Sequence, residues 1–557
     1  MDRQAELSPV EHIKKRSNYL RGTIVESLAD PLTGALAEDD TQLTKFHGFY
    51  QQDDRDERAE RTRRKLEPAY SFMIRVRVPG GITTPAQWLA LDALATTHAN
   101  GTLRLTTRQA FQFHGVTKGN VKKTIRGIND SLLSTIAACG DVNRNVMCTP
   151  LAETSAVHEA ACKVAGDISE HLAPRTRAYH EIWLDGERVA GTVDHEPIYG
   201  ETYLPRKFKI ALAIPPSNDV DVFAHDLGLI AVERNGELAG FNVTVGGGMG
   251  VTHGEPETYP RVADVIGFCR VEQAVAVAEH VVAVQRDYGD RTNRKHARLK
   301  YTIDDRGIEW FRGELFERLG FSLAAPEPFE FRSRGDVFGW SKDQHGKSHL
   351  TLFVPEGRVR DNGQSRLLTA LRELATTLEG EFRLTANQNL VVSNISDEDR
   401  PAIEQLFERH GVNLLQSLSP LRQQALACVA LPTCALAMAE AERYLPEFTG
   451  KVEGLLDAHG LQQESISLRI TGCPNGCARP YLAEIALVGK AAGRYNLFLG
   501  GDSEGLRLNR LARENIDEGD ILATLDQLFA DFARGRAEGE SLGDFANRTQ
   551  FPMAVES

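Results

Sequence analysis

Four of the eight cysteines fall into two short pairs near the end of the chain. Five residues separate Cys428 from Cys434, three separate Cys473 from Cys477, and 38 residues lie between the pairs. Four thiolates are the usual ligands of a [4Fe–4S] cluster. Structural zinc sites built from four cysteines usually space each pair by roughly two to four residues, which the first pair does not fit. The pattern therefore favours an iron–sulfur cluster over zinc.

The residues beside these pairs suit a cluster. The stretch Gly472-Cys473-Pro474-Asn475-Gly476-Cys477 is rich in turn formers, which let backbone N–H groups approach cluster sulfurs and raise the reduction potential. A disulfide framework is typical of small secreted proteins, so we do not expect one in a chain of 557 residues without a signal region. The remaining cysteines stand singly and should be dispensable for a cluster: Cys139, Cys148, Cys162 and Cys269.

Basic residues occupy positions where a protein core normally avoids charge. Arg75 and Arg77 alternate within an apolar strand-like run, and Lys207 and Lys209 would share one face of a strand. Unpaired buried charges are costly, so this placement favours anion binding over a solvated edge strand, which is the alternative. A further run of cations fits either a solvated helix face or an anionic partner. It consists of Arg291, Arg294, Lys295, Arg298 and Lys300.

The cysteine region also resembles a known family. The run from Thr471 to Cys477, followed by Glu484-Ile485-Ala486-Leu487, resembles the signature of the siroheme-containing nitrite and sulfite reductases, and the cysteine spacings match. The resemblance spans nearly the whole chain and is strongest to the bacterial, NADPH-dependent branch of the family. Further similar stretches are 45–48, 51–56, 143–146, 203–209 and 495–497.

The resemblance implies a siroheme joined to a [4Fe–4S] cluster. The implied cluster ligands are Cys428, Cys434, Cys473 and Cys477. Cys477 would also be the axial ligand of the siroheme iron. Siroheme carries many carboxylates and needs cationic partners, and the resemblance places Arg104 and Arg108 against the macrocycle. The asparagine that the family has between these two arginines is Thr107 here, which puts one polar contact in doubt.

The resemblance also implies the reaction, which is the six-electron reduction of sulfite to sulfide. The implied anion-binding residues are Arg77, Arg144, Lys207 and Lys209. No stretch resembles a flavodoxin or NADPH-binding module, so the resemblance implies a separate flavoprotein (alpha) subunit that carries FAD and FMN. One alternative is a ferredoxin-dependent nitrite or sulfite reductase with the same cofactors. A non-catalytic iron–sulfur or zinc scaffold protein is another, but it leaves the Arg/Lys set unexplained.

An internal repeat indicates how these residues are positioned. Residues 94–109 and 374–388 share the pattern Leu-Ala-Thr-Thr, then glycine, Arg-Leu-Thr and glutamine, and each copy follows a strand-like run that ends in proline. Both copies read as strand, helix, strand. We infer an α/β (α+β) protein with two related half-domains about a pseudo-twofold axis, and the family resemblance implies that they are ferredoxin-like.

Composition and the repeat together suggest the organisation of the chain. The formal charge of −13 argues against nonspecific nucleic-acid binding, and no stretch has the roughly 18 apolar residues of a membrane span. With no signal region, we expect a cytoplasmic enzyme. We expect a polar arm for partner docking (1–67), a first half-domain (68–147), a siroheme-binding α/β domain (148–330), a second half-domain (331–425) and a cysteine-bearing α/β domain (426–557).

Overall fold

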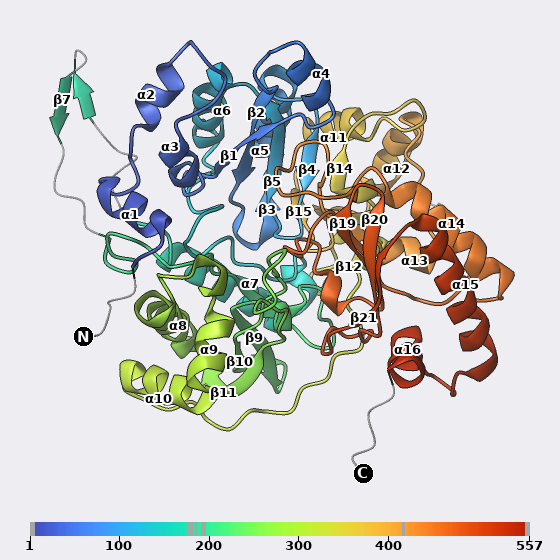
Figure 1. The fold of residues 1–557 in the computed structure, drawn as a ribbon. Helices are drawn as coiled ribbons and strands as arrows, with labels where there is room; N and C mark the ends of the chain where they lie inside the picture. The colour runs from blue at the N-terminus through green and yellow to red at the C-terminus, as the bar shows by residue number, and fades with distance from the viewer. Residues whose placement is uncertain (1–5, 176–181, 185–186, 191–195, 415–417, 552–557) are drawn as a thin grey trace.

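The computed structural model describes residues 6–175, 182–184, 187–190, 196–414 and 418–551. Within these residues the strands form four sheets and one hairpin (Figure 1). The first sheet has the order β1 (Phe49–Asp53), β2 (Tyr70–Val76), β5 (Phe111–Val116), β4 (Leu103–Leu105) and β14 (Arg358–Val359). The second has the order β12 (Gly339–Lys342), β13 (Ser348–Leu352), β16 (Leu390–Ile395), β15 (Glu381–Leu384) and β3 (Ile82–Thr83).

The other two sheets belong to the α/β parts of the chain. The third has the order β11 (Asp264–Arg270), β10 (Glu237–Val245), β9 (Leu227–Arg234) and β8 (Ile210–Ala213). The fourth has the order β17 (Leu426–Ala427), β18 (Leu468–Thr471), β19 (Ile485–Ala491), β20 (Arg494–Leu499) and β21 (Arg510–Ile516). The hairpin consists of β6 (Ile182–Leu184) and β7 (Glu187–Ala190).

Helices connect and cover these sheets. In the first half they are α1 (Pro9–Arg16), α2 (Ile24–Ala29), α3 (Glu38–Leu43), α4 (Arg58–Arg63), α5 (Pro85–His98), α6 (Lys118–Asp130), α7 (Ala156–His171), α8 (Ala274–Tyr288), α9 (Leu299–Arg306) and α10 (Ile308–Leu319). In the second half they are α11 (Leu367–Ala375), α12 (Arg400–Arg409), α13 (Pro420–Gln423), α14 (Leu445–Ala458), α15 (Glu518–Gly535) and α16 (Leu542–Gln550).

The predicted repeat and its pseudo-twofold relation are confirmed by the exchange of one strand between the first two sheets. β14 comes from the second half and pairs with β4 of the first, where Arg358 lies opposite Arg104. β3 comes from the first half and pairs with β15 of the second, where Thr83 lies opposite Phe382. Each half thus completes the sheet of the other.

The helices of the repeat pack where the two halves meet. α5 begins at a capping box, in which the Thr84 hydroxyl accepts from the Gln87 amide and the Gln87 side chain accepts from the Thr84 amide. Trp88 of this helix is fully buried, and its ring centroid lies 4.6 Å from that of Phe382 in the other half. Asp92, one turn further on, forms a two-pronged ion pair with Arg372 of α11. The interface is therefore apolar at its centre and ionic at its margin.

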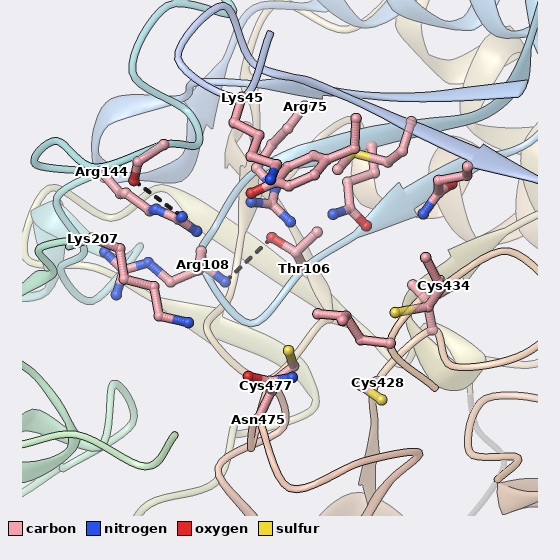
Figure 2. Close-up of a pocket in the computed structure, with 18 of the residues that line it drawn as sticks. Lys45, Arg75, Thr106, Arg108, Arg144, Lys207, Cys428, Cys434, Asn475 and Cys477 are labelled. Atoms are coloured by element: carbon pink, nitrogen blue, oxygen red, sulfur yellow. Dashed lines mark hydrogen bonds between the residues drawn. The ribbon is translucent and has the colours of Figure 1, made fainter. Parts of the chain in front are cut away.

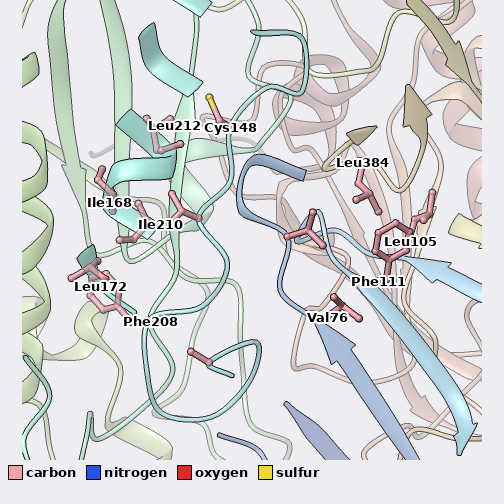
Figure 3. Packing of buried hydrophobic residues seen from close by; sticks show 14 of the residues in the cluster. Val76, Leu105, Phe111, Cys148, Ile168, Leu172, Phe208, Ile210, Leu212 and Leu384 are labelled. Atoms are coloured by element: carbon pink, nitrogen blue, oxygen red, sulfur yellow. The ribbon is translucent and has the colours of Figure 1, made fainter. Parts of the chain in front are cut away.

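The largest buried hydrophobic cluster joins the two half-domains to the third sheet. It contains Val76, Phe111 and Leu384 of the repeat together with Ile210 and Leu212 of β8 (Figure 3). A second cluster packs α14 and α15 against the fourth sheet. Most of the core is therefore continuous, and it supports the segments that form the site described below.

The N-terminal segment contributes to the fold of the first half, in contrast to the polar arm predicted for 1–67. β1 pairs with β2 along its whole length, with Phe49 opposite Ile74. Leu20, Leu43, Phe46 and Phe49 are all buried. These few apolar anchors are spread over a charge-dense stretch, so composition alone did not reveal them. Partner docking by this segment stays a prediction, as do the exact domain boundaries.

Membrane insertion finds no support in the helices. Among the described residues, no helix is both long enough and apolar enough to cross a bilayer.

Candidate active site

A cavity of about 490 Å³ lies where the first sheet, the fourth sheet and the segments around residues 141–144 and 206–209 meet. Figure 2 shows Arg108, Arg144 and Lys207 on one side of this cavity, Cys428 and Cys434 on the other, and Cys477 between them. The volume is in the range typical of cofactor pockets. We call it the central cavity. It brings together all four predicted cluster cysteines and five of the six other predicted site residues.

The topology of the fourth sheet brings the two cysteine pairs together. Cys428 follows β17 directly and Cys473 is the second residue after β18, and these strands are parallel neighbours. The carboxyl ends of parallel neighbours lie at the same edge of a sheet, so both pairs emerge side by side. Gly472 fills the gap between them, since an added Cβ would lie 2.6 Å from both the Ala430 Cβ and the Ala439 carbonyl oxygen.

The thiols lie in a setting that suits a cluster. The Gly472 amide donates to the Cys428 sulfur at 3.3 Å, and the Asn475 side chain donates to the Cys473 sulfur at 3.5 Å. Burial and the neighbouring Cys477 raise the pKa of Cys434 to about 11. Thiols that raise each other's pKa lose their protons readily only when a shared cationic partner binds the thiolates, because metal coordination stabilises the charged form.

Spacing distinguishes a cluster from a single metal ion. Within the described part of the chain, no three His, Cys, Asp or Glu side chains converge closely enough to hold one ion. A [4Fe–4S] cluster needs no such convergence, because each iron takes one thiolate at a separate corner. Four thiols around the wall of a cavity therefore fit the cluster predicted from the sequence better than they fit zinc.

The other lining residues are strongly biased to positive charge. Nine cations and one carboxylate, that of Asp141, line the central cavity of a chain whose formal charge is −13. Such a lining needs an anionic occupant, since like charges buried together are costly. The cations are Lys45, Arg75, Arg104, Arg108, Arg144, Arg206, Lys207, Lys209 and Arg294. A flat cofactor that carries many carboxylates, together with an anionic substrate, meets this need.

Two lysines stand out because their charge is destabilised. Burial, followed by the positive charges of Arg206 and Arg144, lowers the pKa of Lys207 to about 7. Burial and Lys207 hold the pKa of Lys209 well below its usual range. A bound anion would raise both pKa values again. Lys207 can therefore give up a proton near neutral pH, which arginine cannot do.

Arg104 and Arg108 line the cavity as predicted, and both are fixed by partners on the protein side. Arg104 forms an ion pair with Glu442 at 2.7 Å and donates to the Ala427 carbonyl at 3.0 Å. Arg108 donates to His225 Nδ1 at 3.3 Å and to the Asn145 carbonyl. The Nε atom of each arginine is buried without a hydrogen-bond partner. Each side chain thus keeps one unused donor, which is itself covered by protein.

Arg77 does not line the cavity, which corrects the prediction for this residue. Its guanidinium donates to the Ser169 hydroxyl at 2.6 Å and to the Ser169 carbonyl on α7. Arg75, two residues earlier, lines the cavity instead and donates to the Cys139 sulfur at 2.9 Å. β2 ends at Val76, and the Arg77 amide pairs with the Ser134 carbonyl outside the sheet. Strand alternation therefore did not predict where the Arg77 side chain points.

The cation run at 291–300 is mostly structural. Only Arg294 reaches the central cavity, where it pairs with Asp141 at 2.6 Å. Arg291 pairs with Glu11, Lys295 with Glu255 and Arg298 with Asp226. Lys300 donates to the carbonyls of Gly248 and Gly250. Sequence reasoning missed Lys45 and Arg206 as lining residues, although both lie in stretches that carry the family resemblance.

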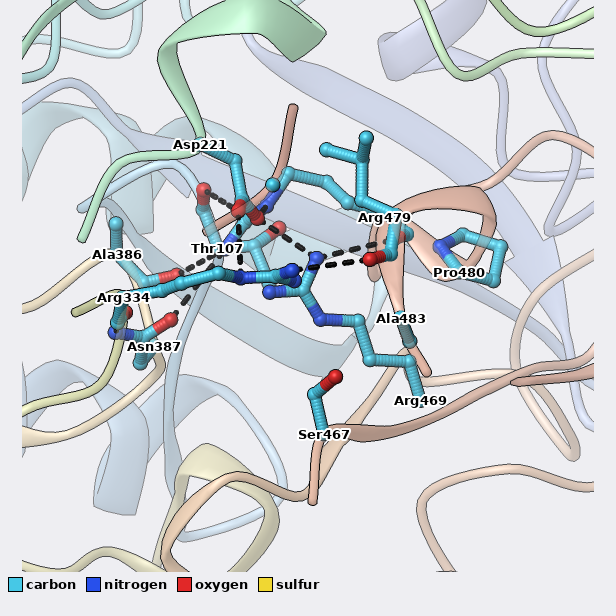
Figure 4. Close-up of polar contacts among 12 residues, drawn as sticks. Thr107, Asp221, Arg334, Ala386, Asn387, Ser467, Arg469, Arg479, Pro480 and Ala483 are labelled. Carbon is cyan, nitrogen blue, oxygen red and sulfur yellow. Dashed lines mark hydrogen bonds and ion pairs between the residues drawn. The ribbon is translucent and has the colours of Figure 1, made fainter. Parts of the chain in front are cut away.

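A buried carboxylate anchors the loop that carries Cys473 and Cys477. Figure 4 shows the side chains of Arg334, Arg469 and Arg479 gathered around Asp221. Arg469 contacts the Asp221 carboxylate at 2.7 Å and Arg334 contacts it at 3.3 Å. Arg479 also donates to the Thr107 carbonyl at 3.1 Å, while the Thr107 hydroxyl donates to the Cys477 carbonyl at 3.0 Å. The residue that departs from the family pattern therefore still makes a polar contact, to the cysteine loop.

Comparison with protein families identifies the architecture. The nitrite and sulphite reductase 4Fe-4S domain matches residues 164–323. The nitrite/sulfite reductase ferredoxin-like half domain matches twice, at residues 64–131 and 341–410. These two matches cover the internal repeat. The first match does not include the four C-terminal cysteines, so their assignment depends on the geometry given above.

Whole-chain relatives agree with the domain matches. The sulfite reductase [NADPH] hemoprotein beta-component of Myxococcus xanthus (strain DK1622) is 61% identical, covering 97% of this chain and 96% of the relative. The protein of the same name from Geobacillus kaustophilus (strain HTA426) is 57% identical over 97% and 95%. Among solved structures, the Mycobacterium tuberculosis NirA protein aligns with a TM-score of 0.79 and 26% identity, over 97% of this chain and 96% of that one.

Proposed function

The chain belongs to the family of nitrite and sulfite reductases, and from this premise we propose that it reduces sulfite to sulfide. It is an oxidoreductase with siroheme and a [4Fe–4S] cluster as cofactors. The observation that carries the proposal for the site is the central cavity, which is lined by four thiols and nine cations. A zinc or iron–sulfur scaffold protein would have no need of those cations.

The residues present fit both cofactors. Cys428, Cys434, Cys473 and Cys477 would hold the cluster, and Cys477 would also be the siroheme iron ligand, a proposal that its position between the thiols and the cations supports. Arg104 and Arg108 would pair with the siroheme carboxylates, a proposal that their place in the lining of the central cavity supports. When bound, the joined cofactors supply electrons to the substrate one at a time.

The remaining cations would handle the substrate. We assign anion binding to Arg75 and Arg144, because arginine keeps its charge at all working pH values. We assign proton donation to Lys207 and Lys209, because burial among cations lowers the pKa of Lys207 to about 7 and holds the pKa of Lys209 below its usual range. Sulfite loses its oxygens as water and so consumes protons. Arg75 replaces Arg77 in the set inferred from the sequence.

Sulfate affinity is expected to fall as pH rises above about 7. The protonated lysine binds the anion, so affinity is full below the pKa of Lys207, about 7, and falls by up to roughly tenfold per pH unit above it. Sulfate keeps its charge across this range, so a change in affinity reports on the protein and not on the anion. Calorimetric titration of the holoenzyme at pH 6, 7, 8 and 9 measures the effect.

Lys207→Arg is the matched control for this pH dependence. Arginine keeps the charge, so affinity should change less between pH 7 and pH 9 than in the unmodified protein. An identical pH profile in the two proteins would show that Lys207 is not the titrating group.

The electron donor is proposed to be a separate flavoprotein (alpha) subunit with FAD and FMN that oxidises NADPH. The names of the relatives, which call them beta-components and specify NADPH, support a partner subunit. Use of NADPH also favours a cytoplasmic location. A ferredoxin-dependent nitrite or sulfite reductase is the second candidate, because the family match and the NirA fold suit either donor.

Two measurements test the proposed function. The optical spectrum of the purified protein should show strong siroheme absorption, and reduced viologen should drive sulfite reduction to sulfide in stoichiometric yield. NADPH should drive the same turnover only when the flavoprotein is added, and reduced ferredoxin should replace it poorly. A protein with both cofactors that reduces nitrite but not sulfite would overturn the choice of substrate.

A further inference from the structure

Two thiols outside the central cavity lie in contact with each other. The Cys148 and Cys162 sulfur atoms are 3.7 Å apart, and both cysteines are free. They come from separate elements, because Cys148 follows the bridge that joins Met147 to Ala211 of β8, while Cys162 lies in the middle of α7. The sequence suggested that each of these cysteines stands alone. The fold makes them a pair.

The two thiols differ in access. Cys148 is fully buried at the edge of the large hydrophobic cluster, beside Leu212 (Figure 3). Cys162 is only partly buried, and its thiol donates to the Thr149 carbonyl at 3.3 Å. Contact with Cys162 and burial raise the pKa of Cys148 well above its usual value, so Cys148 is a poor nucleophile by itself. A dissolved oxidant therefore meets Cys162 first, and Cys148 lies directly behind it.

We propose that Cys148 and Cys162 form a reversible disulfide when the protein meets a hydroperoxide. The Cys162 sulfur attacks one peroxide oxygen, the O–O bond breaks, and the products are a sulfenic acid at Cys162 and water or an alcohol. The Cys148 sulfur then attacks the Cys162 sulfur, loses its proton, and displaces the sulfenic oxygen as water. Two thiols are oxidised by two electrons in total, and one peroxide is reduced. A dithiol reductant returns the disulfide to two thiols by thiol–disulfide exchange and is itself oxidised to a disulfide.

The disulfide would connect α7 to the wall of the central cavity. The Gln109 side chain accepts from the Cys148 amide at 3.1 Å and donates to the Cys148 carbonyl at 2.7 Å. Gln109 adjoins Arg108, which lines that cavity. Closing the loop between residues 148 and 162 reduces the freedom of the unfolded chain, so the oxidised protein should unfold at a higher temperature. The thiol pair itself does not depend on the proposed function.

Peptide mapping gives a direct test. Trypsin cleaves after Arg144 and Lys163, so both cysteines fall in one peptide, 145–163. The holoenzyme is treated with hydrogen peroxide, free thiols are alkylated, and the protein is digested without reduction. We expect this peptide to lose two hydrogens and carry no alkyl group, and cleavage after Glu153 or Glu159 should leave its parts joined. Dithiothreitol should restore alkylation at both positions.

Two variants separate the proposal from general oxidation. Cys162→Ser should abolish the linked peptide and the rise in melting temperature on peroxide treatment. Cys269→Ser, which alters a buried cysteine on β11 in another part of the third sheet, should keep both. Alkylation of both thiols after oxidation, or sulfinic acid at Cys162 without a link to Cys148, would overturn the proposal. Neither outcome bears on sulfite reduction, which is measured separately.

Discussion

Cys473→Ser is expected to yield a protein with little iron and no siroheme. Serine oxygen is a poor ligand for cluster iron, and Cys473 is 7% exposed at the end of β18, so water cannot easily replace the lost thiolate. Siroheme should be lost as well, because Cys477 lies on the same short loop. Iron and labile sulfide content should fall together, and the siroheme absorption band should disappear.

Cys269→Ser is the control for this substitution. It removes another buried thiol, which does not line the central cavity, so it should keep the full content of iron, sulfide and siroheme. Four iron atoms per chain in Cys473→Ser would refute the ligand assignment. A full loss of iron in Cys269→Ser would instead indicate that the thiol substitutions unfold the protein.

The four cysteines that line the central cavity could be singled out from the sequence because their spacing is local. Each pair lies within one turn of chain, so two thiols approach each other whatever the rest of the fold does. The internal repeat was equally visible, since it preserves residues at matching positions in both copies. What the sequence did not reveal was the exchange of β3 and β14 between the halves, because pairing of such short strands leaves no pattern in the sequence.

The cations were harder to place because charge has no periodic signature. Arg294 lines the cavity while Arg291 and Lys295, within three residues of it, pair with carboxylates elsewhere. Arg291 pairs with Glu11 and Lys295 pairs with Glu255, and the fold brings each of these pairs together from distant parts of the sequence. Lys45 was missed because its position also depends on the fold. It reaches the cavity from the N-terminal segment, which the buried residues Phe46 and Phe49 fix against the first sheet.

Arg75→Ala is expected to weaken sulfate binding about ten- to a hundredfold. The guanidinium of Arg75 lies at the central cavity, held by the Cys139 sulfur. Loss of one charged hydrogen bond costs roughly 1.5–3 kcal/mol, which gives this change in affinity. Turnover with saturating sulfite should fall less than affinity, because the lysines that we propose as proton donors remain. Calorimetry with sulfate and steady-state kinetics with sulfite measure the two effects.

Arg77→Ala provides a control from the same strand-like run. This arginine bonds to Ser169 on α7 and does not line the cavity, so its loss should leave sulfate affinity within about threefold. It should instead lower the free energy of unfolding by about 1–3 kcal/mol, because the Ser169 carbonyl and hydroxyl lose a buried charged partner. If Arg77→Ala weakened sulfate binding more than Arg75→Ala did, the anion would have to bind on the α7 side of the strand. The pair of variants thus locates the substrate on one side of residues 75–77, which neither substitution could do alone.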